Sequence, residues 1–265
     1  MDFDISQIAV PFRMQPGLRR IALDDMRLAP LRRDSRLYAE KKAIVEAGAA
    51  RHQVSGFDPS PALQTIADLG VRSGIARGPD HFPELAFEED FAVLDGTTGS
   101  VPWLCVCVPS HWAPEEKIGL DFTALHQPVA DNAALLSAAN QLVSLVTAGQ
   151  AWERFVWTLA SSPGYDQHPQ RHPRERWPRA VDDDGLADAC WLRAERQCFT
   201  PVGKGTAQAL FSIRVMLEPL TQAVATPGMA RRLHDSLASM SDAVLDYKNL
   251  HAVRQPLLRW LSARA

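Results

Sequence analysis

Two cysteines and two histidines lie close together in the segment WLCVCVPSHWAPEEKIGLDFTALHQPV, which starts at Trp103. Cys105, Cys107, His111 and His126 could together supply four ligands to a zinc ion. Structural zinc sites usually have two to four residues between their cysteines, whereas one residue separates this pair. Buried cysteines also pack as small apolar side chains. We therefore expect the two cysteines to belong to the core.

Other catalytic motifs are absent from the sequence. Ser110 precedes His111, but no G-x-S-x-G surrounds the serine. The chain has no G-x-G-x-x-G, and GKGT at 203–206 lacks the upstream glycine of a phosphate-binding loop. The sequence therefore favours neither a serine hydrolase nor a nucleotide-binding protein.

Charged residues interrupt two apolar segments in the C-terminal half of the chain. Arg193, Glu195 and Arg196 lie in CWLRAERQCF, and Arg214 lies in ALFSIRVML. A charge buried without a partner is costly, so two interpretations stay open. The charges face solvent on a half-exposed sheet, or they line a pocket and bind an anion such as a carboxylate.

His126 stands alone in LHQPV, between a turn-prone Gly-Leu-Asp and a predicted helix. A lone histidine is usually a structural or surface residue. If His126 is a metal ligand, a single neutral imidazole without a second ligand nearby suits haem better than zinc.

The composition is that of an ordinary globular protein. The chain has 265 residues, 46% hydrophobic and 22% charged, and a net charge of −3, which argues against a nucleic-acid partner. No apolar run approaches the roughly 18 residues that span a bilayer. The start, MDFDISQIAV, does not resemble a secretory signal, and four cysteines without such a signal indicate reduced thiols. We expect a cytoplasmic protein with no membrane partner.

Hydrophobic periodicity predicts the elements that must position these residues. Helices are expected at 34–51, 60–70 and 131–148 and near the C-terminus, where Pro256 begins a final helix. Strands are expected at 91–95, 101–108, 152–159, 190–199 and 209–217, joined mostly by hairpins. The proline-rich segment 163–185 is expected to be a long surface loop. This pattern predicts an α+β fold with an antiparallel sheet, in one domain spanning 1–265.

An ordered set of short motifs resembles one known family. The motifs are EED at 88–90, PSHW at 109–112, EKIG at 116–119, LHQPV at 125–129, RFVW at 154–157, RAERQ at 193–197 and LFSIR at 210–214. Over roughly residues 10 to 260 the chain resembles the haem-dependent oxidative N-demethylase α-subunit-like family. The resemblance implies a PAS-like fold with an antiparallel sheet, flanking helices and bound haem b.

The resemblance also implies an activity. It is a monooxygenase-type oxidative demethylation of a small secondary amine, such as dimethylamine, using oxygen. Electrons would come from reductase subunits that carry flavin and iron–sulfur centres. The chain has no nucleotide motif and no cysteine-rich cluster, so a partner must supply those electrons.

Residue roles follow from the matching motifs. The resemblance implies that His126 is the axial haem ligand and that Lys117 faces a haem propionate. It makes Arg154 the residue that handles bound oxygen. Arg193, Arg196 and Arg214 become partners of propionates or of pocket ion pairs, with Glu195 as their internal partner and a catalytic residue beside Arg154.

One departure from the family pattern leaves a second function open. Val156 stands where the family usually has asparagine. The alternative is a non-catalytic haem- or small-ligand-binding PAS-like sensor or interaction module. For the amine itself a carboxylate or an aromatic face is expected, and the candidates are Asp131, Trp152, Trp157 and Trp177.

Overall fold

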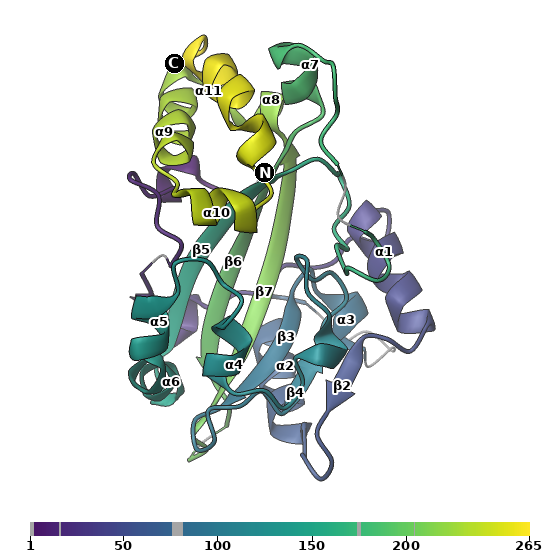
Figure 1. Cartoon of the computed structure of the whole chain (residues 1–265). Helices are drawn as coiled ribbons and strands as arrows, with labels where there is room; N and C mark the ends of the chain where they lie inside the picture. Colours follow the sequence, from purple (N-terminus) through teal and green to yellow (C-terminus); the bar gives the residue numbers. More distant parts are fainter. Residues whose placement is uncertain (1–2, 16, 76–81, 174–175, 204) are drawn as a thin grey trace.

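A computed structural model describes residues 3–15, 17–75, 82–173, 176–203 and 205–265 of the chain (Figure 1). Within these residues the strands form a seven-stranded sheet in the order β1-β5-β6-β7-β3-β4-β2. Each pair of neighbouring strands is antiparallel. Helices flank this sheet, so the predicted α+β class with an antiparallel sheet is confirmed.

The sheet is built around three long central strands. They are β5 (Ala151–Ala160), β6 (Trp191–Pro201) and β7 (Gln208–Pro219). The shorter strands are β1 (Arg19–Ile21), β2 (Arg51–Gln53), β3 (Asp90–Asp95) and β4 (Trp103–Cys105). The predicted strands at 91–95, 152–159, 190–199 and 209–217 are confirmed, and the one predicted at 101–108 is limited to β4. Strands β1 and β2 carry too few apolar residues to be recognised.

The helices are mostly short. In the N-terminal half they are α1 (Arg36–Glu46), α2 (Ser60–Arg72), α3 (Pro83–Ala86), α4 (Phe122–His126), α5 (Ala133–Ser137) and α6 (Ala139–Thr147). After β5 follow α7 (Asp183–Asp188), α8 (Leu220–Ala223), α9 (Pro227–Ala238), α10 (Asp242–Tyr247) and α11 (Arg254–Ser262). Single 3₁₀ turns lie at Ile5–Gln7, Leu23–Asp25, Pro114–Glu116 and His251–Val253.

The helix ends test the sequence-based expectations. Asp34 and Ser35 both have side chains that suit a helix start, and Ser35 is the one that caps α1, because its side chain accepts a hydrogen bond from the backbone N–H of Tyr38. Helix α2 continues past Gly70, and a Cβ there would come within 2.8 Å of the Phe87 ring, so this glycine serves close packing. The prediction of a single helix at 131–148 was wrong, because the segment forms two helices, α5 and α6, that are divided at Ala138.

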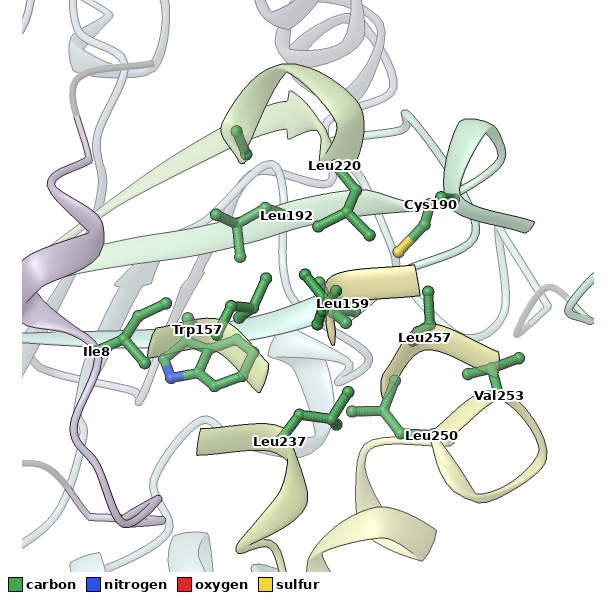
Figure 2. Close-up of a cluster of buried hydrophobic side chains, with 14 of the residues drawn as sticks. Ile8, Trp157, Leu159, Cys190, Leu192, Leu220, Leu237, Leu250, Val253 and Leu257 are labelled. Carbon is green, nitrogen blue, oxygen red and sulfur yellow. The ribbon is translucent and has the colours of Figure 1, made fainter. Parts of the chain in front are cut away.

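One face of the sheet is sealed by apolar packing near the C-terminal helices. There α7 to α11 gather at one end of β5, β6 and β7 (Figure 1). Trp157 and Leu159 of β5 and Leu192 of β6 meet Leu237 and Leu257 in this cluster (Figure 2). Helices α4, α5 and α6 cover the other face (Figure 1). Residues of all three helices line the candidate site.

A buried lysine fastens α1 to the start of β3. Lys41 is 0% exposed, and its Nζ lies 3.1 Å from Oδ1 of Asp90. The same ammonium donates to the carbonyl oxygens of Phe87 and Glu89 at 3.0 and 2.8 Å. Oδ2 of Asp90 accepts from the backbone N–H groups of Cys107 and Val108. Burial opposes the charged form, but Asp90 together with Cys107 and Cys105 leaves the pKa of Lys41 above its ordinary value.

The helices also bear on the expected absence of a membrane span. Across the described ranges, none of them combines the length and the apolar character that a bilayer crossing requires.

Candidate functional site

The alternation of side chains along β6 divides its charged residues between the two faces of the sheet. Arg193, Glu195 and Gln197 lie two residues apart and share one face, whereas Arg196 faces the other way. Across the ladder, Arg154 of β5 is directly opposite Gln197. Strand pleating therefore gathers Arg154, Arg193 and Glu195 on one side.

That side borders a cavity of about 710 Å³, which is within the range of about 300–1,000 Å³ typical of small-molecule sites. Much of its wall is apolar and comes from the sheet and the covering helices, including Leu104, Leu125, Leu142, Val146, Phe199 and Phe211. His126, Lys117, Arg154, Arg193 and Glu195 also line it. Five of the seven residues singled out in the sequence thus meet at one place.

His126 is the last residue of α4, a helix capped by the Asp121 side chain. Its Nδ1 lies 2.7 Å from the carbonyl oxygen of Phe122. Because a carbonyl oxygen only accepts, Nδ1 must carry the proton, which leaves a lone pair on Nε2 when the ring is neutral. No described residue hydrogen-bonds to Nε2.

The charge state of His126 agrees with a ligand role. Burial lowers the pKa of His126. The nearby charges of Arg154 and Lys117 lower it further, whereas the hydrogen bond to Phe122 raises it. The neutral imidazole is therefore favoured over a wider pH range than in water. A half-buried, neutral ring with a fixed tautomer is the form of histidine that binds a metal.

A chain of hydrogen bonds runs across the sheet beside this imidazole. Nε of Arg154 donates to Oε1 of Gln197 at 2.7 Å, and Nε2 of Gln197 donates to Oε2 of Glu195 at 2.8 Å. The hydroxyl of Ser110 donates to Oε1 of Glu195 and accepts from Nε of Arg193 at 2.9 Å. Glu195 is the acidic residue among the described cavity-lining residues, and neutral groups separate it from both arginines.

Arg193 uses its guanidinium mainly to hold two loops together. The side chain is buried, at 1% exposure, and it donates to the carbonyl oxygens of Val108, Gly164 and Tyr165 at 3.4, 3.3 and 3.0 Å. Burial lowers the pKa of Arg193, and the negative charge of Glu195 opposes that shift. This residue braces the cavity wall with donors that are already engaged.

Two other cations at the cavity have unengaged side chains. Lys117 and Arg13 line it, and neither makes an ion pair or side-chain hydrogen bond with any residue in the described ranges. Sequence reasoning missed Arg13, because PFRMQPGLRR contains several arginines and nothing in their spacing distinguishes one of them.

Arg196 and Arg214 lie on the opposite face and do not line the cavity. Nε of Arg196 donates to Oε2 of Glu153 at 2.8 Å, and Nε of Arg214 donates to Oε2 of Glu88 at 2.7 Å. These two arginines form ion pairs within the chain, which is one of the two roles expected for them.

The cysteines of the Cys-x-Cys pair are both buried, and they belong to different apolar clusters. Burial raises the pKa of each thiol, so both stay protonated. No group of three or more histidine, cysteine, aspartate or glutamate side chains in the described ranges is arranged to hold a metal ion. His111 lines the cavity instead, with a positive φ of 62°.

The four amine-binding candidates are spread over the molecule. Trp157 lines the cavity, whereas Trp152 packs in the neighbouring apolar cluster. Trp177 borders a smaller cavity and donates through Nε1 to the carbonyl oxygen of Asn249. Oδ2 of Asp131 accepts from the Ser241 hydroxyl, and Asp131 lies outside the cavity lining.

Comparison with protein families gives one match over this architecture. Residues 83–258 match the family described as haem-dependent oxidative N-demethylase, alpha subunit-like. The chain belongs to this family. The match covers β3 to α11, and so includes His126, Lys117, Arg154, Arg193 and Glu195.

The cavity fits the haem in the family's description on three independent observations. The apolar wall suits the faces of a porphyrin, and His126, whose Nε2 has no hydrogen-bond partner among the described residues, lines the space. Lys117 and Arg13 are cations that have no side-chain partner in the part of the chain that the structure describes, which suits the two propionates. A haem site needs only one protein ligand to the iron, and His126 can supply it.

Proposed function

We propose that this chain is the haem-binding subunit of an oxidative demethylase that acts on a small secondary amine such as dimethylamine. The proposal is carried by one observation: His126, whose Nδ1 is held by a carbonyl oxygen and whose Nε2 has no partner among the described residues, lines a 710 Å³ cavity with a largely apolar wall. Membership of the demethylase α-subunit-like family supplies the reaction class.

Haem b would be held by His126 at the iron and by Lys117 and Arg13 at the propionates. When bound, this group supplies the activation of oxygen and the oxidation of the methyl carbon. The overall reaction consumes the amine, O₂, two electrons and two protons, and it yields the demethylated amine, formaldehyde and water. The two electrons come from a separate reductase with flavin and iron–sulfur centres.

The polar chain beside His126 has two tasks in this proposal. Arg154 keeps donors for an oxygen ligand, because only its Nε is engaged by Gln197 among the described residues. Glu195 accepts one hydrogen bond at each oxygen, which leaves lone pairs for the N–H of an amine. Its negative charge offsets the cost of bringing an ammonium into the cavity.

The test begins with purified protein and hemin. We expect one equivalent of hemin to bind and give a Soret band that dimethylamine perturbs. With oxygen and an electron donor, the loaded protein should release formaldehyde from dimethylamine. A protein that does not take up hemin contradicts the proposal at its first step.

The same assay addresses the sensor alternative, which Val156 keeps open. Val156 lines the cavity opposite Glu195 in the ladder, so the usual asparagine is replaced at the site itself. Hemin binding without formaldehyde release from any of several methylamines would favour a sensor over an enzyme. Restoring the polar group with Val156→Asn is the matched comparison.

A further inference from the structure

A second, smaller cavity adjoins the first. Its volume is about 280 Å³, and it shares His111, Leu159, Gln167 and Lys248 with the lining of the larger cavity. Most of the remaining wall is polar, and it includes residues 160–162, Gly164, Glu40 and Asp166. The two spaces thus meet where a polar compartment gives way to a largely apolar one.

Gln167 at this junction has an unsatisfied amide. Its side chain is buried, at 5% exposure of the residue, and Oε1 has no hydrogen-bond partner among the described residues. Nε2 makes none with them either. An unsatisfied buried amide oxygen is destabilising, so a ligand N–H that reached it would be favoured.

The backbone holds Gln167 next to the Glu195 network. The N–H of Gln167 donates to the carbonyl oxygen of Pro109 at 3.0 Å, and Gln167 forms a parallel bridge with Ser110. Ser110 in turn donates to Glu195. The position of the residue is therefore fixed, while rotation about its last side-chain bond can present either the oxygen or the nitrogen to the cavity.

We propose that Gln167 is a positioning and specificity-determining residue that accepts a hydrogen bond from the N–H of the substrate amine. This inference rests on the proposed function. A secondary ammonium carries two N–H groups, and Gln167 and Glu195 offer one neutral and one charged acceptor for them. A quaternary ammonium has no N–H and gains nothing from Gln167. The amide thus selects for amines that carry hydrogen.

Calorimetric titration of the hemin-loaded protein tests this assignment without relying on turnover. The ligands are dimethylamine and tetramethylammonium, and the variant is Gln167→Met, which keeps the length of the side chain and removes both amide atoms. We expect dimethylamine binding to weaken about tenfold, the loss of one hydrogen bond. Tetramethylammonium binding should change less than about twofold.

Two further variants separate hydrogen bonding from packing. Gln167→Glu keeps an acceptor and should bind dimethylamine at least as tightly as the wild type. Gln170→Met changes an exposed glutamine of the same loop and should leave both affinities unchanged. Hemin titration and thermal melting of each variant establish that it is folded and loaded.

The outcomes distinguish this inference from the proposed function. If Gln167→Met weakens both ligands equally, or neither, or if Gln167→Glu behaves as Gln167→Met does, the positioning role is wrong. A wild-type protein that binds hemin and no dimethylamine overturns the substrate of the proposed function and this inference with it.

Discussion

The two faces of the central sheet treat the same kinds of side chain in opposite ways. On the face away from the cavity, Glu153 lies 2.6 Å from Arg19 and 2.8 Å from Arg196, and Arg214 meets Glu88. On the cavity side, in the segments that cover the sheet, Lys117 has no side-chain partner and Nε2 of His126 has none among the described residues. Ion pairs complete the first face within the chain, and the second is completed only by a ligand.

This difference shows which part of the molecule gives up folding stability to keep groups available for a ligand. An unpaired polar group in a partly buried place lowers the free energy of unfolding, so a chain keeps such groups only where something else uses them. The comparison also separates two effects of mutation. Changes on the paired face should lower stability and spare ligand binding, whereas changes on the cavity face should do the reverse.

The largest effect is expected from the buried ion pair between α1 and β3. Lys41→Met leaves Asp90 buried without its cation, and we expect the free energy of unfolding to fall by about 3–5 kcal/mol. Urea denaturation measures the change. Lys42→Met is the control, because Lys42 forms an exposed pair with Glu46 and should cost less than about 1 kcal/mol. Equal losses from the two variants would refute a structural role for the buried lysine.

His126→Ala should act in the opposite manner. We expect hemin affinity to fall about a hundredfold, or about 2.7 kcal/mol, with little change in the stability of the protein without haem. Absorbance titration and thermal melting measure the two quantities. His251→Ala, at an exposed histidine, should alter neither. An unchanged Soret band in His126→Ala would show that the imidazole does not bind the haem iron.

Glu89 gives a prediction about pH on the paired side. Burial raises its pKa to about 7, against the opposing hydrogen bonds from the backbone of Ala29. From pH 5 to pH 8 stability must fall, because the unfolded carboxyl is already mostly ionised at pH 5 whereas the folded one loses its proton only around pH 7. In Glu89→Gln the fall in the free energy of unfolding between pH 5 and pH 8 should be smaller by about 2–3 kcal/mol. Denaturation curves recorded at these two pH values measure it. A decline of the same size in the variant would assign it to another group.

The smallest effect is expected at the propionate cations. Lys117→Gln should weaken hemin binding about fivefold, or about 1 kcal/mol, and the loss should shrink at high salt. Arg214→Gln is the comparison on the other face, and it should leave hemin affinity unchanged while lowering stability. If Arg214→Gln weakens hemin binding as much as Lys117→Gln does, the division between the two faces does not hold.

The sequence predicts much of the sheet because its central strands are long and rich in β-branched and aromatic residues. Strands β5, β6 and β7 appear where expected. The fold class followed from these elements. Helix α4 was missed, since five residues carry too little periodicity to reveal a helix.

The candidate site was only partly visible from the sequence. Motif order and a lone histidine pointed to His126, but the spacing along β6 could not say which arginines share a face with it. Register settles that point, as Arg193 and Arg196 face opposite sides of one strand. Gln167 gave no signal, because its importance depends on a bridge to Ser110 that only the folded chain creates.

The cavity wall formed by α4, α5 and α6 consists of helices of five, five and nine residues. Isolated helices shorter than about 12–15 residues are marginal in water, so each of these depends on the apolar surface beneath it. In the proposed complex that surface includes the porphyrin. Cofactor insertion and completion of this wall then become a single folding event, and supply of haem during biosynthesis would govern how much mature protein accumulates.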